Sequence, residues 1–107
     1  MICINFNGTD YKLEFNRKIV SSMEDSGFVI DLDKPNTMVD RLFYGAFQMN
    51  HKRIDRELVR KIWAAQTGKE ALLAELVKEY QKPLEELMAE PTAPEGEENP
   101  TPTWRAV

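Results

Sequence analysis

Apolar and polar side chains alternate along residues 2–15, with a polar interruption at NGTD. A period of two places every second side chain on one face of a β-strand, so this pattern predicts two half-buried strands joined by a turn. The alternating apolar positions are Ile2, Ile4, Phe6, Tyr11, Leu13 and Phe15. We therefore expect an N-terminal β-hairpin, which needs another element packed on its apolar face to be stable.

The turn of this hairpin has two possible registers. In one, Asn-Gly at 7–8 forms a type I′ turn, and Ile4 pairs with Tyr11. In the other, Gly-Thr at 8–9 forms a type II′ turn, and Phe6 pairs with Tyr11. We favour the second register, because it matches more apolar residues across the two strands.

Apolar positions spaced three and four residues apart predict four helices after the hairpin. Asn16 is suited to cap the first helix, and Gly27 is suited to end it. Thr37, with Asp40 three residues later, predicts the start of the second helix through a capping box. Gly68 is expected to end the third helix. The four helices are predicted at about residues 17–26, 38–50, 56–67 and 69–89.

The second predicted helix contains the stretch LFYGAFQMNH, residues 42–51, which is rich in aromatic side chains. Its apolar residues cover roughly 200° of the helix, about double the usual core-facing stripe. Gly45 costs about 1 kcal/mol in a helix relative to alanine, so we expect another backbone to pass close to it. We interpret this helix as the centre of the core in preference to the lining of a ligand pocket.

The fourth predicted helix, residues 69–89, carries one apolar stripe along its whole length. Proline inside a helix removes a hydrogen bond and costs about 3 kcal/mol or more. We therefore expect a kink or a restart near Pro83, with the apolar face continuing through it. The members of the stripe are Leu73, Leu76, Val77, Tyr80, Leu84, Leu87 and Met88.

The composition changes at Glu90. Residues 90–107 hold four of the six prolines and few apolar side chains, which is typical of disorder. Trp104 is the exception, and it is either incidental or a docking anchor. The predicted architecture is one small domain over residues 1–89, of class α+β and mostly α, with an N-terminal β-hairpin packed on about four helices. A disordered, acidic, Pro/Glu-rich tail follows over 90–107.

The charge is unevenly distributed along the chain. The formal net charge is −4, with a net of +4 over residues 51–69 and −6 over residues 70–107. Nucleic-acid binding driven by counterion release is therefore unfavourable except through the basic segment 51–61. We interpret that segment as a solvated helix face or a docking surface for acidic groups, with a small nucleic-acid-binding regulator as the alternative. Its basic residues are Lys52, Arg53, Arg56, Arg60 and Lys61.

The residue types offer little for catalysis. The chain has one histidine, His51, and one cysteine, Cys3. There is no Ser-His-Asp set, no paired thiols to hold a metal, and no glycine-rich loop to hold a phosphate. We expect no enzyme activity, no cofactor and no metal. No apolar run approaches the roughly 20 residues of a membrane span, and the N-terminus does not resemble a signal peptide, so we expect a soluble cytoplasmic protein.

Three stretches carry a resemblance to a known family: YKLEFNRKIVSSMEDSGF, LFYGAFQMNH and ELVKEYQKPLEELM. Over residues 6–88 the chain resembles the small tail assembly chaperones of long-tailed (siphovirus-type) phages and prophages of Gram-positive bacteria. More narrowly, it is similar to a phage-derived family without an assigned activity. Such chaperones coat the helical, aggregation-prone tape measure protein until tube subunits polymerise around it and displace them.

The resemblance implies a non-enzymatic role, with the tape measure protein as the main partner and the tail tube protein as a second one. It also implies a protein that is not retained in the virion. A structural tail or head-completion subunit is a further alternative. A small body favours a weak homo-oligomer. The residues expected to contact a helical partner are Tyr80, Leu84, Leu87 and Met88, because apolar residues at helical spacing can hold a partner helix, with Trp104 as a separate anchor in the tail. The alternative is that the helix residues pack within the chain on Leu58, Ile62 and Trp63.

Overall fold

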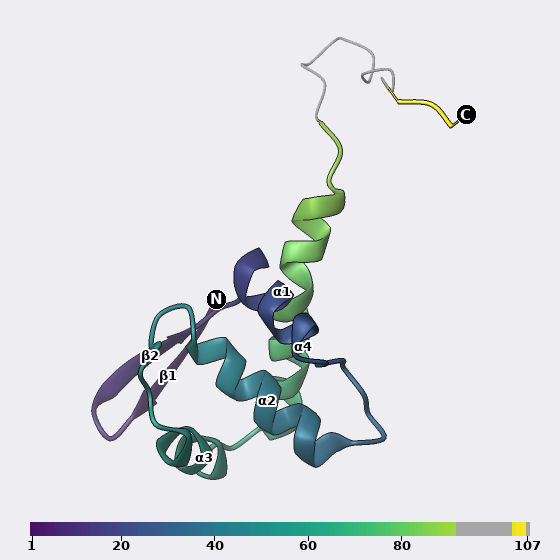
Figure 1. The fold of residues 1–107 in the computed structure, drawn as a ribbon. Helices are drawn as coiled ribbons and strands as arrows, with labels where there is room; N and C mark the ends of the chain where they lie inside the picture. Colours follow the sequence, from purple (N-terminus) through teal and green to yellow (C-terminus); the bar gives the residue numbers. More distant parts are fainter. Residues whose placement is uncertain (92–103, 107) are drawn as a thin grey trace.

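Figure 1 shows the computed structural model, which describes residues 1–91 and 104–106. The predicted class is confirmed, because a two-stranded antiparallel hairpin precedes four helices. The prediction of disorder over 90–107 falls mostly on residues 92–103 and 107, outside the described part. The elements are β1 (Ile2–Phe6), β2 (Thr9–Leu13), α1 (Arg17–Asp25), α2 (Pro35–Phe47), α3 (Arg56–Ala64) and α4 (Lys69–Met88).

The hairpin adopts the register that we did not favour from the sequence. Ile4 lies opposite Tyr11, so residues 7–8 form the turn. Asn7 has φ 50° and Gly8 has φ 82°. A type I′ turn requires positive φ at both central residues, and Asn-Gly is the preferred sequence for it. The conformational preference of the turn therefore outweighs the number of apolar pairs across the strands.

Hydrogen bonds tie the region around the end of β2 to the last turn of α2 and to the residues that follow it. The Glu14 backbone N–H donates to the Ala46 carbonyl at 3.1 Å, and the Lys12 N–H donates to His51 Nε2 at 3.1 Å. Phe15, just beyond β2, is buried without a partner on the opposite strand. The register that leaves Phe15 unpaired therefore still leaves that residue only 8% exposed.

The two predicted helix starts had different outcomes. Asn16 caps α1 as expected, since its Oδ1 accepts the Ile19 N–H at 2.8 Å. The start predicted from Thr37 is wrong, because α2 already begins at Pro35, with Lys34 in the cap position. Proline fits the first position of a helix, where its fixed φ suits the helix and no N–H is needed. The second helix therefore covers Pro35–Phe47 and not 38–50.

Gly27 ends the first helix as predicted. It has φ 89°, its N–H donates to the Glu24 carbonyl, and the Phe28 N–H donates to the Met23 carbonyl. These two bonds form a Schellman motif, which turns the chain back across the end of the helix. Gly68 does not end the third helix as expected. That helix ends at residue 64, and Gly68, with φ 66°, comes directly before α4.

Helix α2 is the central element of the core, as expected. It packs against α3, α4 and β2, while α1 packs against α4. The rings of Phe43 and Phe47 are fully buried and meet edge to face, with their centroids 5.1 Å apart. The buried residues of α2 are Met38, Leu42, Phe43, Gly45, Ala46 and Phe47.

Gly45 is closely covered, although not by a backbone as we expected. A Cβ at this position would lie 2.6 Å from Sδ and 2.8 Å from Cε of Met23. The neighbour is therefore the flexible end of a side chain on α1. The small residue lets α1 and α2 approach each other through that methionine.

Helix α4 runs without interruption from Lys69 to Met88, with Pro83 inside it. Pro83 is itself buried, and the helix continues past it instead of restarting. In Figure 1 the last turns of α4 extend beyond α1 and the rest of the folded body. The apolar stripe of α4 therefore begins in the core and ends outside it.

Candidate functional site

The best candidate for a functional site is an apolar groove between α4 and the segment that follows α1. Its volume is about 530 Å³. Phe28, Val29 and Ile30 form one wall, while Tyr80 and Leu84 of α4 form the other. Glu24, Gly27 and Gln81 complete the lining.

The Schellman turn at Gly27 sets the orientation of the first wall. Because the chain reverses there, Phe28 enters the core and is almost completely buried, while Val29 is exposed. The Tyr80 ring meets Phe28 edge to face, with centroids 5.4 Å apart, and meets Phe15 in the same way at 5.3 Å. Tyr80 is thus half-buried in the wall of the groove, and its position is set by aromatic packing.

The apolar residues beyond Tyr80 are largely exposed. Leu84 has an exposed fraction of 58%, Leu87 of 55% and Met88 of 71%. Spacings of three and four residues place all three on one face of α4. We call these three residues together with the groove the α4 face. It is an apolar surface of the kind that marks interaction sites in small proteins.

The predicted partner-contacting residues are only partly brought together. Tyr80 and Leu84 line the groove, and Leu87 and Met88 continue the same helix face. Trp104 is 75% exposed and is separated from α4 by residues 92–103, which lie outside the described part. No described contact joins Trp104 to the α4 face, so its role as an anchor stays a prediction.

Sequence reasoning missed the first wall of the groove. None of residues 28–30 is among the residues that the sequence predicts to contact a partner. Val29 is exposed on this segment, and so is Leu32 two residues after it. The available signal was the run Phe-Val-Ile directly after a helix-ending glycine, because three apolar residues outside a regular element must be covered or serve as a contact surface.

Acidic side chains lie near the α4 face, with Glu85 beside its apolar stripe and Glu86 on the opposite side of the helix at about 100° per residue. Glu24 lies at the groove, and Glu85 and Glu86 lie on the last turns of α4. All three are exposed, and none of them forms an ion pair within residues 1–91 and 104–106. The pKa of Tyr80 is raised, mainly because the phenol is partly buried and further because Glu24 is near, while Arg41 opposes the shift.

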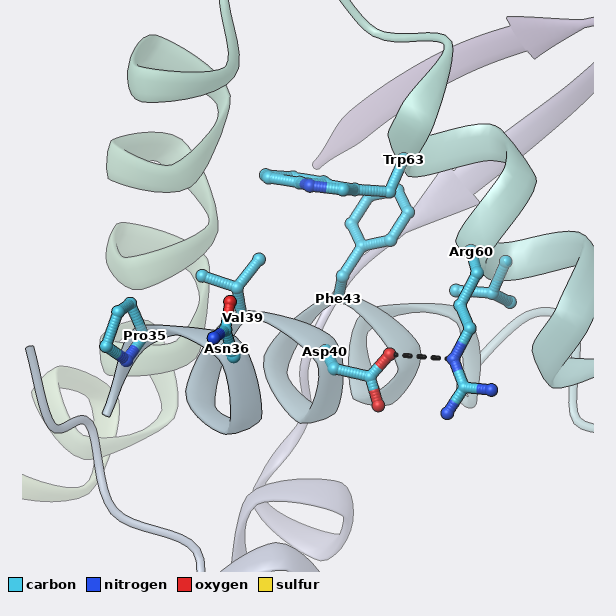
Figure 2. Close-up of a pocket in the computed structure, with 8 residues that line it drawn as sticks. Pro35, Asn36, Val39, Asp40, Phe43, Arg60 and Trp63 are labelled. Atoms are coloured by element: carbon cyan, nitrogen blue, oxygen red, sulfur yellow. Dashed lines mark hydrogen bonds and ion pairs between the residues drawn. The ribbon is translucent and has the colours of Figure 1, made fainter.

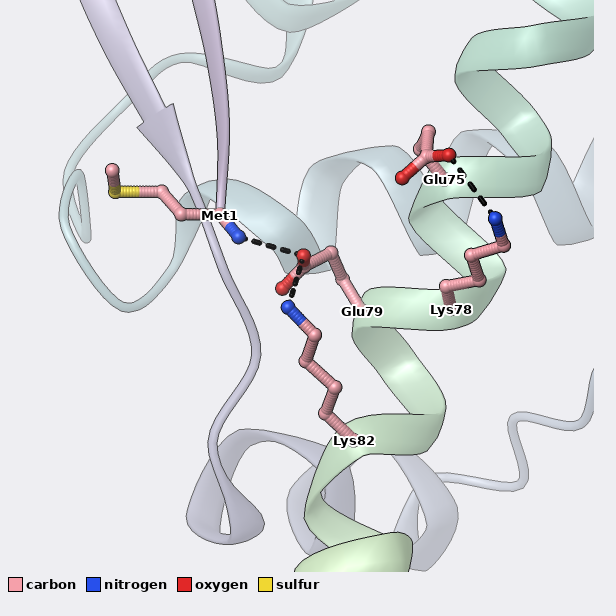
Figure 3. A network of polar contacts seen from close by, with 5 residues as sticks. All are labelled: Met1, Glu75, Lys78, Glu79 and Lys82. Carbon is pink, nitrogen blue, oxygen red and sulfur yellow. Dashed lines mark hydrogen bonds and ion pairs between the residues drawn. The ribbon is translucent and has the colours of Figure 1, made fainter.

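Glu79 lies on α4 one turn before Pro83 and is a buried charged residue. Its Oε1 accepts bonds from the Met1 α-amino group at 2.6 Å and from Lys82 Nζ at 2.7 Å (Figure 3). Burial raises the pKa of Glu79, but the bonds from Lys82 and the α-amino group outweigh it and leave the pKa below the ordinary value of 4.5. This network joins the start of β1 to the middle of α4.

A second hollow, of about 320 Å³, lies between α2 and α3 (Figure 2). The rings of Phe43 and Trp63 meet edge to face in its wall, with centroids 5.0 Å apart. At its rim, Arg60 Nε donates to Asp40 Oδ1 at 3.2 Å. Because these two charges already satisfy each other, the hollow offers few free polar groups to orient a small molecule.

The basic segment 51–61 is partly occupied by contacts within the chain. Arg60 pairs with Asp40 and also with Glu57, at 3.0 Å. The guanidinium of Arg56 lies over the Tyr44 ring, 4.4 Å from its centroid. These two cations therefore stabilise the α2–α3 packing, which weakens the segment as a phosphate-binding surface.

His51 is half-buried against Tyr11 and Phe47, and its Nε2 accepts a hydrogen bond from the Lys12 backbone N–H. In the described residues, no group of three or more His, Cys, Asp and Glu side chains is placed as metal ligands would be. Over the same residues, no helix is both long enough and apolar enough to cross a membrane.

The fold and the site together define a small α+β domain with an exposed apolar helix face. A family model described as a domain of unknown function (DUF5055) matches residues 1–104. The chain therefore belongs to this family. No curated protein and no solved structure matches it.

Proposed function

We propose that this protein is a non-enzymatic assembly chaperone of the phage tail type, which binds the helical tape measure protein before the tail tube polymerises. The observation that carries the proposal is the α4 face, where Leu84, Leu87 and Met88 are all more than half exposed. The sequence resemblance supplies the identity of the partner.

An exposed helix face next to a groove suits a helical partner. Helix-in-groove recognition uses apolar anchors spaced by three and four residues, which is the spacing on α4. The groove between Val29 and Leu84 gives such a partner a second line of apolar contact. Met88 adds adaptability, because an unbranched thioether can pack against varied surfaces.

The small size of the α4 face agrees with reversible binding. An assembly chaperone must be displaced when tube subunits arrive, so its affinity must be moderate. A few exposed apolar side chains and one open groove provide less contact than the standard interface of stable complexes. We place this role in the host cytoplasm, with the protein absent from the finished particle and the tail tube protein as a second partner.

The test is co-expression with the tape measure protein from the same gene cluster, followed by a solubility assay and a pull-down. We expect the tape measure protein to become soluble and to co-purify with this chain. The variant Leu84→Asp with Leu87→Asp should abolish both effects, because two buried carboxylates would oppose apolar docking. Circular dichroism should show an unchanged fold, since both positions are exposed.

The matched control is Glu70→Asp with Glu75→Asp, at exposed positions on the N-terminal half of the same helix. This control should retain full binding. An insoluble tape measure protein with no co-purification would overturn the proposal. Recovery of the chain from purified particles would instead favour a structural subunit.

A further inference from the structure

We propose that the α4 face selects a partner helix of one charge type: an amphipathic helix whose apolar stripe is flanked by lysine or arginine. This inference rests on the proposed function and adds the chemistry of the partner. It follows from the acidic groups near the α4 face, Glu24 and Glu85 above all, and from the absence of an ion pair to them within the described residues.

Glu75 and Glu79, in the middle of α4, have ion-pair partners that Glu85 and Glu86 lack within the described residues. Glu75 pairs with Lys78 at 3.3 Å, and Glu79 pairs with Lys82 at 2.7 Å, each three residues further along. The positions three residues after Glu85 and Glu86 are Met88 and Ala89, which carry no charge. Lys82, the nearest base before them on the helix, is already bound to Glu79.

The direction of the helix makes these charges more unfavourable. The C-terminal end of a helix carries partial negative charge and prefers cations in its last turn. The last turn of α4 contains no basic residue. Glu85 and Glu86 therefore add to the negative potential at the end of α4, and a cationic partner would relieve it.

The opposite wall of the groove adds charge of the same sign. Glu24 lines the groove and is near enough to Tyr80 to affect its ionisation. The nearby cation, Arg41, donates to Ser26 Oγ at 2.6 Å and lies over the Phe28 ring, and it forms no ion pair within the described residues; its charge offsets only part of the field of Glu24. An apolar stripe entering this groove would thus meet carboxylates on both sides.

A second copy of this chain is a poorer occupant than a different protein. The basic surface of the chain lies on α3, whose apolar residues Val59 and Ile62 are already buried. Arg60, on the same helix, is held by two carboxylates. A partner for the α4 face needs basic side chains beside an exposed apolar stripe. Helix α3 has the basic side chains, but its apolar residues Val59 and Ile62 are buried.

The test uses two synthetic helical peptides with the same leucine stripe, one flanked by lysines and the other by glutamates. Binding to the full chain is measured by fluorescence anisotropy at low and high salt. We expect the lysine peptide to bind at least about tenfold more tightly, because several unpaired carboxylates each add a modest attraction. The ratio should fall as salt screens these exposed charges.

Two charge-removing variants locate the effect. The first is Glu24→Gln with Glu85→Gln and Glu86→Gln, which should reduce the preference to within about twofold. The second is Glu57→Gln with Glu70→Gln and Glu75→Gln, which changes the net charge equally but away from the α4 face. This control should keep the preference of the original chain.

Each result decides between the inference and the function on which it rests. Equal binding of both peptides, or an unchanged preference in the first variant, overturns the charge selection and leaves apolar docking in place. Binding of neither peptide overturns both. A dimer in sedimentation that dissociates when peptide is added assigns the α4 face to a second copy and overturns the proposal of a different partner.

Discussion

The two halves of α4 carry the same apolar repeat in different surroundings. In the N-terminal half, Leu76 is fully buried against the core, and the carboxylate of Glu79 is held by two cations. In the C-terminal half, after Pro83, the three large apolar side chains are all more than half exposed. The comparison shows that a periodic stripe predicts a helix and its apolar face, but not the part of that face that the chain itself covers.

Hydrogen exchange gives the largest expected contrast between the two halves. Amides of residues 72–79 should be protected up to nearly the full free energy of unfolding, because they lie in the packed part of the helix. Amides of residues 84–88 should exchange through local opening. The difference in opening free energy should be on the order of 5 kcal/mol. Equal protection would mean that the C-terminal half is stabilised by contacts absent from the isolated chain.

Truncating one leucine in each half should give unequal losses of stability. Leu76→Ala removes a fully buried side chain and should lower the free energy of unfolding by about 2–5 kcal/mol. The matched change Leu87→Ala lies at an exposed position and should change it by less than about 0.5 kcal/mol. Urea denaturation followed by circular dichroism measures both. Similar losses would contradict the division of α4 at Pro83.

The charge network at Glu79 should give a smaller and pH-dependent effect. Its pKa is lower in the folded chain, so its contribution is present above the ordinary value of 4.5 and is lost as the pH falls through the folded value. Glu79→Gln should cost about 1 kcal/mol near neutral pH, since Lys82 and the α-amino group are each about half exposed. The loss should disappear at an acidic pH below the folded pKa of Glu79.

Urea unfolding at both pH values measures this difference. The control is Glu75→Gln, which removes an exposed pair with Lys78 and should cost less than about 0.5 kcal/mol at either pH. A cost for Glu79→Gln that does not vary with pH would show that the residue acts through packing and not through its charge.

The successes and errors of sequence reasoning have physical causes. Asn16 was correctly identified as a cap, because its bond to the Ile19 amide needs only residues within one turn. Thr37 was chosen as a cap by the same rule, but Pro35 lies two residues earlier and starts the helix first. The predicted hairpin register is wrong, because the number of apolar pairs across the strands matters less than the turn. Asn7-Gly8 favours positive φ angles, and these fix a type I′ turn at residues 7–8.

The candidate site was predictable on one side only. Leu84, Leu87 and Met88 follow from the helical period of a single segment. Val29 and Ile30 do not, because their position opposite Tyr80 depends on how α1 and α4 pack. The ion pair of Arg60 also could not be predicted from the sequence, because its partner Asp40 lies on a different helix.

The sequence alone determined the local structure of this protein: a hairpin, four helices, and one apolar stripe on the last of them. These follow from backbone preferences and from side-chain periods that act over a few neighbouring residues. Only the tertiary structure decided which apolar residues are covered and which carboxylates are paired. Burial and ion pairing depend on segments distant in the sequence, such as α1 and α2 against α4, so the exposed end of α4 emerges only when the packed chain has covered the rest of the stripe.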